Sequence, residues 1–302
     1  MVNFKIKIAG LVLEINCFNE TTKRYCRDFL TDLPKDLEIN LTEEDLKNEV
    51  INSTNNQFYV DEEISALYRK IADTLIEKNI VVFHSSSIKV GGYAFIFTAR
   101  SGVGKSTHTR LLSELLGDKM IYINDDKPLL EVKNDEIIIH SSPWNGKERR
   151  GNDISAPLKA IVFLSRGEEN TYKKIDDKST HYLNLISQIY LPYDKAKRAK
   201  ALNIADEIIK KVNLYEIYVN KDISAAKMTY ERIIKNEIKW KLLDSWYWKW
   251  RNLNCCWRRD KEIPWYRKIE FYRRRNCSPY WTKWPFSWRN LWALLWKMPK
   301  WW

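Results

Sequence analysis

The sequence lacks the features that mark a secreted, membrane-spanning or metal-binding chain. Its first residues contain no basic stretch followed by a long apolar run, so we expect no signal peptide. No run of 18 uncharged apolar residues occurs, so we expect no transmembrane helix. The five cysteines show no C-x-x-C spacing and have no histidine nearby to complete a metal site. Their odd number favours reduced thiols and a cytoplasmic location.

Tryptophan and excess positive charge are scarce in most of the chain and concentrated at its end. Residues 240–302 hold 13 of the 14 tryptophans, together with 15 of the 51 basic residues and only 4 of the 39 acidic ones. The 239 residues before them therefore carry a net charge of only +1, out of +12 for the whole chain of 302 residues. A near-neutral body offers no broad basic surface, and we expect no nucleic acid partner for it.

Hydrophobic patterning predicts three parts: a small α+β region over residues 1–80, an α/β domain over 81–239, and a basic, Trp-rich tail over 240–302. The first part alternates apolar and polar residues on both sides of Gly10, which predicts a strand hairpin, and then shows helical spacing over 61–78. The second part begins with two β-rich runs, IVVFHSSSIKV and YAFIFTA, and the Gly91-Gly92 pair between them predicts another hairpin.

Further along, the middle of the chain is richer in strands than in helices. A helix ending near Gly117 is followed by the short strand patterns MIYIND, PLLEV and EIIIH, and then by LKAIVFLS, whose continuous apolar character predicts a central strand. The pattern of this domain ends with two helices over about 180–190 and 195–212, the strand LYEIYV and a helix near 223–236. We therefore predict an α/β fold with a mixed, largely antiparallel sheet.

The strongest chemical signal is a glycine-rich segment, Ala99 to Thr107, between an apolar strand and an amphipathic helix. Its sequence fits the Walker A pattern with Ala99 in place of the first glycine. Glycines allow a tight turn whose amides converge on one anion, and the helix that follows directs its positive end to the same point. Lys105 is then placed for the β- and γ-phosphates of ATP, and Ser106 for Mg²⁺. The binding residues are predicted to be Ser101, Gly102, Val103, Gly104, Lys105, Ser106 and Thr107.

An acidic pair, Asp125-Asp126, follows the strand MIYIN at the position where a strand next to the glycine-rich strand would end. Adjacent residues there can point in different directions, so one carboxylate can bind Mg²⁺ while the other accepts a proton. The alternative is a plain turn, because Asn124 to Pro128 is rich in turn-forming residues. Three further polar residues are weaker candidates: His84 on the first strand of the Gly91-Gly92 hairpin, and Glu148 and Arg150, for metal and phosphate respectively.

Taken together, these motifs resemble those of the HPr kinase/phosphorylase family, which is related to the ATP-dependent phosphoenolpyruvate carboxykinases. That family has a histidine before the hairpin, as His84 here, a G-x-S-G-x-G-K-S loop, an Asp-Asp pair and an E-x-R-G segment, matched by Glu148 to Gly151. Its glycine loop lies in a mostly antiparallel sheet. The agreement covers about 160 residues, from His84 to the helix after LYEIYV, and it favours the shorter HPr kinase-like branch.

The resemblance implies an ATP- and Mg²⁺-dependent transfer of phosphate to a serine of a small protein or peptide, and assembly into homo-oligomers. It implies catalytic roles for Asp125, Asp126, Lys105 and His84. It also implies that Arg150 contacts the nucleotide and that the metal ligands are Ser106, Asp126 and Glu148. The chain departs from authentic HPr kinases in its short N-terminal part and in Gly151-Asn152-Asp153 where they have G-L-G, so HPr itself is not implied as substrate.

Two other functions stay open at this point: a nucleotide-binding regulatory module without turnover, and a kinase acting on a small molecule. The tail also has three interpretations. Interleaved Trp, Lys and Arg are typical of an anchor on a membrane surface and of a platform for single-stranded nucleic acid. The abrupt change of composition at residue 240 also fits a disordered or frameshifted end.

Overall fold

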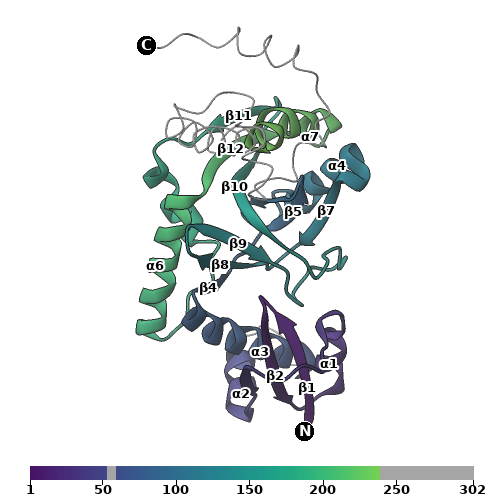
Figure 1. Ribbon diagram of the computed structural model, residues 1–302, viewed down its shortest axis with the longest axis vertical. Coiled ribbons are helices and arrows are strands. Elements are labelled where there is room, and N and C mark those ends of the chain that lie inside the picture. Colours follow the sequence, from purple (N-terminus) through teal and green to yellow (C-terminus); the bar gives the residue numbers. More distant parts are fainter. Residues whose placement is uncertain (53–58, 239–302) are drawn as a thin grey trace, which may run out of the picture. The chain divides into compact units, whose positions relative to one another are not determined.

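The computed structural model describes residues 1–52 and 59–238, which lie within one compact unit, Met1–Lys241 (Figure 1). The sequence-based interpretations of the tail fall outside the described residues. The strands are β1 (Val2–Ile8), β2 (Leu11–Cys17), β3 (Leu37–Asn40), β4 (Ile80–Val82), β5 (Ser86–Val90), β6 (Tyr93–Thr98), β7 (Met120–Asn124), β8 (Leu129–Lys133), β9 (Glu136–His140), β10 (Ser155–Arg166), β11 (Thr171–Lys174) and β12 (Asn213–Val219). The α-helices are α1 (Glu20–Tyr25), α2 (Glu43–Asn52), α3 (Tyr59–Leu75), α4 (Lys105–Leu116), α5 (Tyr182–Ile186), α6 (Lys195–Lys211) and α7 (Ile223–Thr229).

The N-terminal region, β1 to α3, has its own sheet and apolar core. The predicted hairpin across Gly10 is confirmed, since β1 pairs antiparallel with β2, and β3 adds to β2 in parallel. The predicted helix over 61–78 is also confirmed: it is α3, continued by one 3-10 turn to Lys78. The apolar face of α3, with Leu67, Ile71 and Leu75, is buried in the same core as the strands. Burial of this face, rather than helix propensity alone, stabilises α3.

A buried carboxylate links α3 to the start of α1. Glu63 is fully buried, and its oxygens accept hydrogen bonds from the Asn19 amide at 3.1 Å, the Asn19 side chain at 2.6 Å and the Thr22 hydroxyl at 2.6 Å. These bonds offset the cost of burying the charge. Glu63→Ala is therefore expected to lower the free energy of unfolding by about 3 kcal/mol, because three donors lose their acceptor. Urea unfolding measures this, with the exposed Glu44→Ala as control; equal stability of the two variants would contradict the assignment.

The main sheet has nine strands and is mixed, as predicted. Its order is β4-β8-β9-β10-β6-β5-β7, with β12 also on β10 and β11 on β12. Only the pairs of β10 with β6 and with β12 are parallel, and the other pairs are antiparallel. The Gly91-Gly92 hairpin is confirmed as β5–β6. LKAIVFLS forms the central strand β10, which pairs with β9 through its first residues and with β12 through its last.

Helices cover both faces of this sheet. On one face, α5 and α6 bury Leu185, Ile204 and Ile208 against it, and on the other α4 and α7 bury Leu112 and Ala226 (Figure 1). The helix α4 also packs against α7. In the part of the chain that the structure describes, no helix is long and apolar enough to cross a membrane.

Three sequence-based predictions need correction. The run IVVFHSSSIKV is two strands, because β4 pairs with β8 while β5 pairs with β6 and β7; His84 therefore lies between strands rather than on the hairpin. The strand β7 is not next to β6, since β5 lies between them. The helix predicted over 180–190 is only α5, because the chain then turns to hydrogen-bond the β4–β5 link: the Gln188 carbonyl accepts from the His84 amide at 2.7 Å. The sequence patterns also missed β3, β11, α1 and α2.

Candidate functional site

The glycine loop, Ala99–Thr107, connects the end of β6 to the start of α4. Gly102 and Gly104 have φ values of +76° and +126°, which residues with a Cβ rarely adopt. Successive amides at such a turn converge on one point, and the N-terminus of α4 adds its positive end there. Gly102 and Gly104 therefore give the loop a tight turn directly before the first residue of α4.

An arginine at the end of β10 donates hydrogen bonds to two carbonyl groups of this loop. Arg166 donates from Nε to the Val103 carbonyl at 3.2 Å and from Nη2 to the Gly102 carbonyl at 2.5 Å. These bonds hold two successive peptide units in the middle of the glycine loop. Sequence reasoning did not find Arg166, because it lies more than 60 residues further along the chain and belongs to no local motif.

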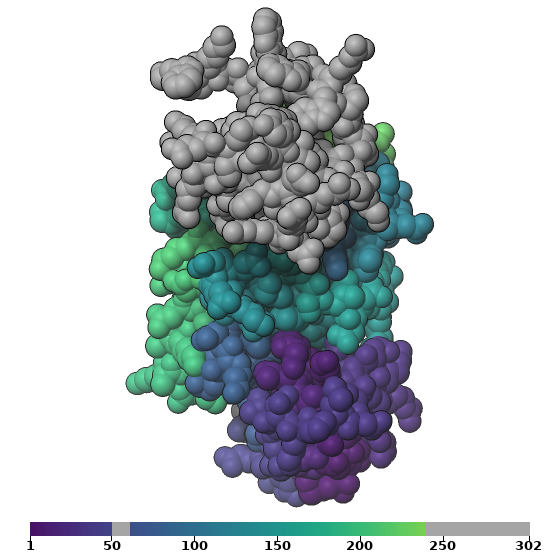
Figure 2. Space-filling model, in the orientation of Figure 1, coloured from purple at the N-terminus to yellow at the C-terminus, as the bar shows by residue number. Residues whose placement is uncertain are grey.

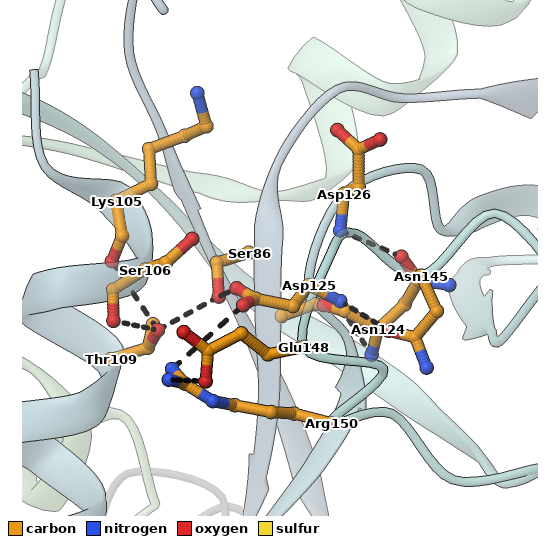
Figure 3. A network of polar contacts seen from close by, with 11 residues as sticks. Ser86, Lys105, Ser106, Thr109, Asn124, Asp125, Asp126, Asn145, Glu148 and Arg150 are labelled. Atoms are coloured by element: carbon orange, nitrogen blue, oxygen red, sulfur yellow. Dashed lines mark hydrogen bonds and ion pairs between the residues drawn. The ribbon is translucent and has the colours of Figure 1, made fainter. Parts of the chain in front are cut away.

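Lys105, the first residue of α4, lies within the electrostatic reach of both acids. Its Nζ donates to the Ala99 carbonyl at 3.2 Å. Burial lowers the pKa of Lys105, and the negative charges of Asp126 and Asp125 oppose that decrease. The ammonium group is thus held at the mouth of the glycine loop, opposite two carboxylates that favour its charged form (Figure 3).

The Asp125 carboxylate points toward α4, across the intervening strand β5. The Ser86 hydroxyl of β5 donates to its Oδ1 at 2.5 Å and also lies 2.9 Å from the Thr109 hydroxyl of α4. Only 6% of the Asp125 side chain is exposed. Burial raises the pKa of Asp125, and the hydroxyls of Ser86 and Ser106 oppose the increase. The strand that separates β7 from β6 therefore supplies the hydroxyl that connects the acid to the helix.

The Asp126 side chain points in a different direction from that of Asp125 (Figure 3). Its Oδ1 lies 3.5 Å from His84 Nε2, and the two side chains are 34% and 37% exposed. Burial and the neighbouring charge of Lys105 lower the pKa of His84, which favours the neutral imidazole. The two acids of the pair therefore have different surroundings, one enclosed by hydroxyls and one open.

Two asparagines hold the backbone of the acidic pair. The Asn124 side chain accepts from the amides of Asp126 at 2.9 Å and Lys127 at 2.7 Å, and Asn145 Oδ1 accepts from the Asp125 amide at 2.8 Å. The turn expected as an alternative to a functional site is thus present, and it is what separates the two carboxylates. A Cβ on Gly151 would meet the Asn145 side chain at 2.3 Å, which explains the glycine there.

Glu148 and Arg150 lie at the edge of the same cluster. Arg150 donates from Nη2 to Glu148 at 2.5 Å, and its Nη1 is 3.9 Å from Asp125 Oδ2. The Glu148 side chain is 66% exposed. Among the described residues, no three or more His, Cys, Asp and Glu side chains gather closely enough to hold a metal ion by themselves.

A cavity of about 330 Å³ adjoins the glycine loop, and neither Asp125 nor Asp126 lines it. Its walls are mostly apolar, and the polar groups of Glu168, Asn220 and Lys221 also line it. The remaining lining residues are Val103, Gly104, Thr107, His108, Leu111, Leu164, Arg166, Gly167 and Val219. Thus Val103, Gly104 and Thr107 belong both to the loop and to the cavity, so the cavity is continuous with the loop.

Comparison with known proteins identifies one structural relative by name. No family model and no curated protein matches the chain. Among solved structures it is similar to the Hpr(Ser) kinase/phosphatase from Coxiella burnetii, with 10% sequence identity and a TM-score of 0.35. The match covers 55% of this chain and 96% of that chain.

Proposed function

We propose that the protein is an ATP- and Mg²⁺-dependent kinase that transfers the γ-phosphate to a serine hydroxyl of a small protein or peptide. The supporting observation is the meeting of a glycine loop, Lys105 and two carboxylates with different surroundings at one end of the main sheet. Phosphoryl transfer needs little more than this: a cradle for the phosphates, positive charge, and a group that accepts the hydroxyl proton.

The nucleotide is expected to bind with its phosphates on the glycine loop and with its ribose and base in the adjoining cavity. The loop amides and the Lys105 ammonium group hold the β- and γ-phosphates. Because Val103, Gly104 and Thr107 belong to the loop and also line the cavity, we expect the nucleotide to leave the loop beside them. The apolar walls of the cavity suit a flat base, as ligand pockets generally do.

Ser106 and Asp125 are the residues that we expect to hold the metal. Both offer oxygen atoms, which Mg²⁺ prefers, and one or two protein ligands suffice because phosphates and water complete its coordination. The proximity of Ser106 to the Asp125 carboxyl favours Asp125 over Asp126, the residue suggested from the sequence. Bound there, Mg²⁺ neutralises charge on the phosphate oxygens.

Asp126 is then the proton acceptor. Its carboxylate is partly exposed and lies near Lys105, and the lowered pKa of His84 beside it favours the neutral imidazole. The serine oxygen forms a bond to the γ-phosphorus, the bond from that phosphorus to the β–γ bridging oxygen breaks, and the serine proton passes to Asp126. Lys105 stabilises the charge that develops on the leaving oxygen.

A transfer assay tests the proposal. The full-length protein is incubated with ATP labelled at the γ-phosphate, Mg²⁺, a panel of serine-containing peptides and small proteins, and separately a metabolite mixture. We expect phosphoserine in the first reaction and no labelled metabolite in the second. Binding of ATP without any transfer would support a regulatory module instead, and a labelled metabolite would support a small-molecule kinase.

The cavity gives a further prediction. Val219→Phe fills part of the space proposed for the base, so we expect the Kd for ATP to rise about tenfold, which corresponds to about 1.4 kcal/mol. The affinity for inorganic pyrophosphate, which has no base, stays unchanged. Competition binding measures both, with Tyr218→Phe on the exposed side of β12 as control. If Val219→Phe lowers the affinities for ATP and for pyrophosphate equally, the base does not bind in this cavity.

A further inference from the structure

Arg149, the variable position between Glu148 and Arg150, has a backbone conformation that its side chain does not favour. Its φ is +47°, in the left-handed region that residues other than glycine, asparagine and aspartate seldom occupy. Such a conformation persists only where surrounding contacts enforce it. For Arg149, those contacts come from the N-terminal region.

The guanidinium of Arg149 binds the last residue of α1 and the segment that follows it. Its Nη2 donates to the Tyr25 carbonyl at 3.0 Å and to Asp28 Oδ2 at 2.7 Å. The same group lies over the Tyr25 ring, 5.2 Å from its centroid. Three contacts of different kinds thus fix one side chain. Figure 2 shows the N-terminal region directly against the part of the chain that contains the main sheet. The contact is therefore oriented rather than a loose surface ion pair.

The other end of the same loop is also anchored on the N-terminal region. Trp144 is buried in that region's apolar core, edge-on to Tyr68 with ring centroids 5.3 Å apart. Its carbonyl accepts from the Lys127 amide at 3.2 Å, directly after the acidic pair. The loop from Trp144 to Arg149 is therefore held at both ends by residues of α1, α3 and the segment after α1.

Between these anchors lie the groups that hold Asp125. Asn145 accepts from the Asp125 amide at 2.8 Å, and Gly146 lies beside the Asp125 carbonyl, where a Cβ would be in ordinary van der Waals contact with the oxygen at 3.4 Å. Arg150, next to Arg149, places Nη1 3.9 Å from the Asp125 carboxylate. A shift of the loop would therefore move both the backbone and the electrostatic partner of this acid.

We infer that the N-terminal region positions the acidic pair, and that Arg149, Asp28 and Tyr25 are positioning residues acting through the Trp144–Arg150 loop. The expected effect on turnover rests on the proposed function. The mechanical link, meaning that contacts with the N-terminal region hold the Trp144–Arg150 loop and thereby the acidic pair in place, does not rest on it. Small misplacements of a reacting group cost large factors in rate, up to about 10² for 1 Å. The N-terminal region would thus contribute to the geometry of the site through these contacts.

Two variants of the full-length protein test this inference. Arg149→Gly removes the side-chain contacts while retaining a residue that adopts positive φ freely, so the loop is released without new strain. Asp28→Asn weakens the same contact from the other side and lies at the surface, and Asp32→Asn is its exposed control. Each variant is assayed for kcat, for the KM of ATP, and for hydrogen exchange of peptides covering residues 123–128 and 145–153.

We expect Arg149→Gly to lower kcat about tenfold with the KM of ATP changed less than about twofold, because the glycine loop is untouched. Asp28→Asn should lower kcat about threefold, and the double variant should be no worse than Arg149→Gly, since both changes break one contact. Amides of both peptides should exchange faster in each variant, but not in Asp32→Asn.

The two readouts separate this inference from the proposed function. If the wild-type protein transfers no phosphate, the proposed function fails, and faster exchange in the variants still decides for the mechanical link. Unchanged exchange in Arg149→Gly and Asp28→Asn would overturn the inference, whatever the activity. The inference would also be overturned if the wild-type protein transfers phosphate and the Arg149→Gly variant has the same kcat.

Discussion

Replacing Asp126 with Asn is expected to lower the rate of phosphate transfer to serine by about 10²–10⁴, the range typical for loss of a general base. Asparagine keeps the size of the side chain and its place beside His84, but it cannot accept the hydroxyl proton at neutral pH. Because Asp126 lies away from Ser106 and the cavity, the KM for ATP should change little. Steady-state kinetics with a fixed peptide acceptor measures both constants.

Asp125→Asn provides the contrast that separates the two acids. Its carboxylate lies with Ser86, Ser106 and Thr109, so we expect its loss to raise the Mg²⁺ concentration needed for half-maximal activity as well as to lower kcat. The double variant should lose transfer while largely retaining nucleotide binding. Asp135→Asn, in the exposed β8–β9 turn, is the matched control. Full activity in the double variant would refute the role of the pair, and a shifted Mg²⁺ requirement in Asp126→Asn alone would exchange the two assignments.

Lys105→Ala is expected to lower kcat/KM for ATP by at least about 10³, since the ammonium group is the positive charge proposed to stabilise the transferred phosphate. The change removes a single hydrogen bond, to the Ala99 carbonyl, so the thermal stability of the protein without nucleotide should stay within a few degrees. Because the proposed role of Lys105 is electrostatic, both nucleotide binding and turnover should decrease.

Calorimetry with ATP and Mg²⁺, together with the transfer assay, measures the two effects. Lys119→Ala, an exposed lysine just beyond the other end of α4, is the control for a general loss of positive charge. Comparable activities of Lys105→Ala and Lys119→Ala would show that the glycine loop is not the phosphate site.

The sequence was sufficient for features that depend on nearby residues. The glycine loop needs only the order of Gly102, Gly104 and Lys105 between a strand and a helix, and both are present. The two hairpins follow from Gly10 and Gly91-Gly92, whose conformational freedom is local. The central position of β10 follows from its unbroken apolar character.

Contacts between distant segments were beyond the sequence. The strand β5 enters between β6 and β7, so the link from Asp125 to α4 runs through Ser86, and no local pattern shows which strands are neighbours. Asn145 and Arg166 reach the site from loops and strand ends 20 or more residues away from the groups they bind. Arg149 occupies the variable position of its motif, where a pattern carries no information, and its partner Asp28 lies 121 residues earlier.

The central claim is that the glycine loop and the acidic pair form one site for a metal-bound nucleotide. A crystal structure with Mn²⁺ and a non-hydrolysable ATP analogue tests it most directly, because the anomalous signal locates the metal. We expect Mn²⁺ between the Ser106 hydroxyl, the Asp125 carboxylate and the terminal phosphates, the γ-phosphate near Lys105 and Asp126, and the base in the cavity beside Thr107. A nucleotide bound away from the glycine loop, or a metal bound away from both Ser106 and the acidic pair, would contradict it.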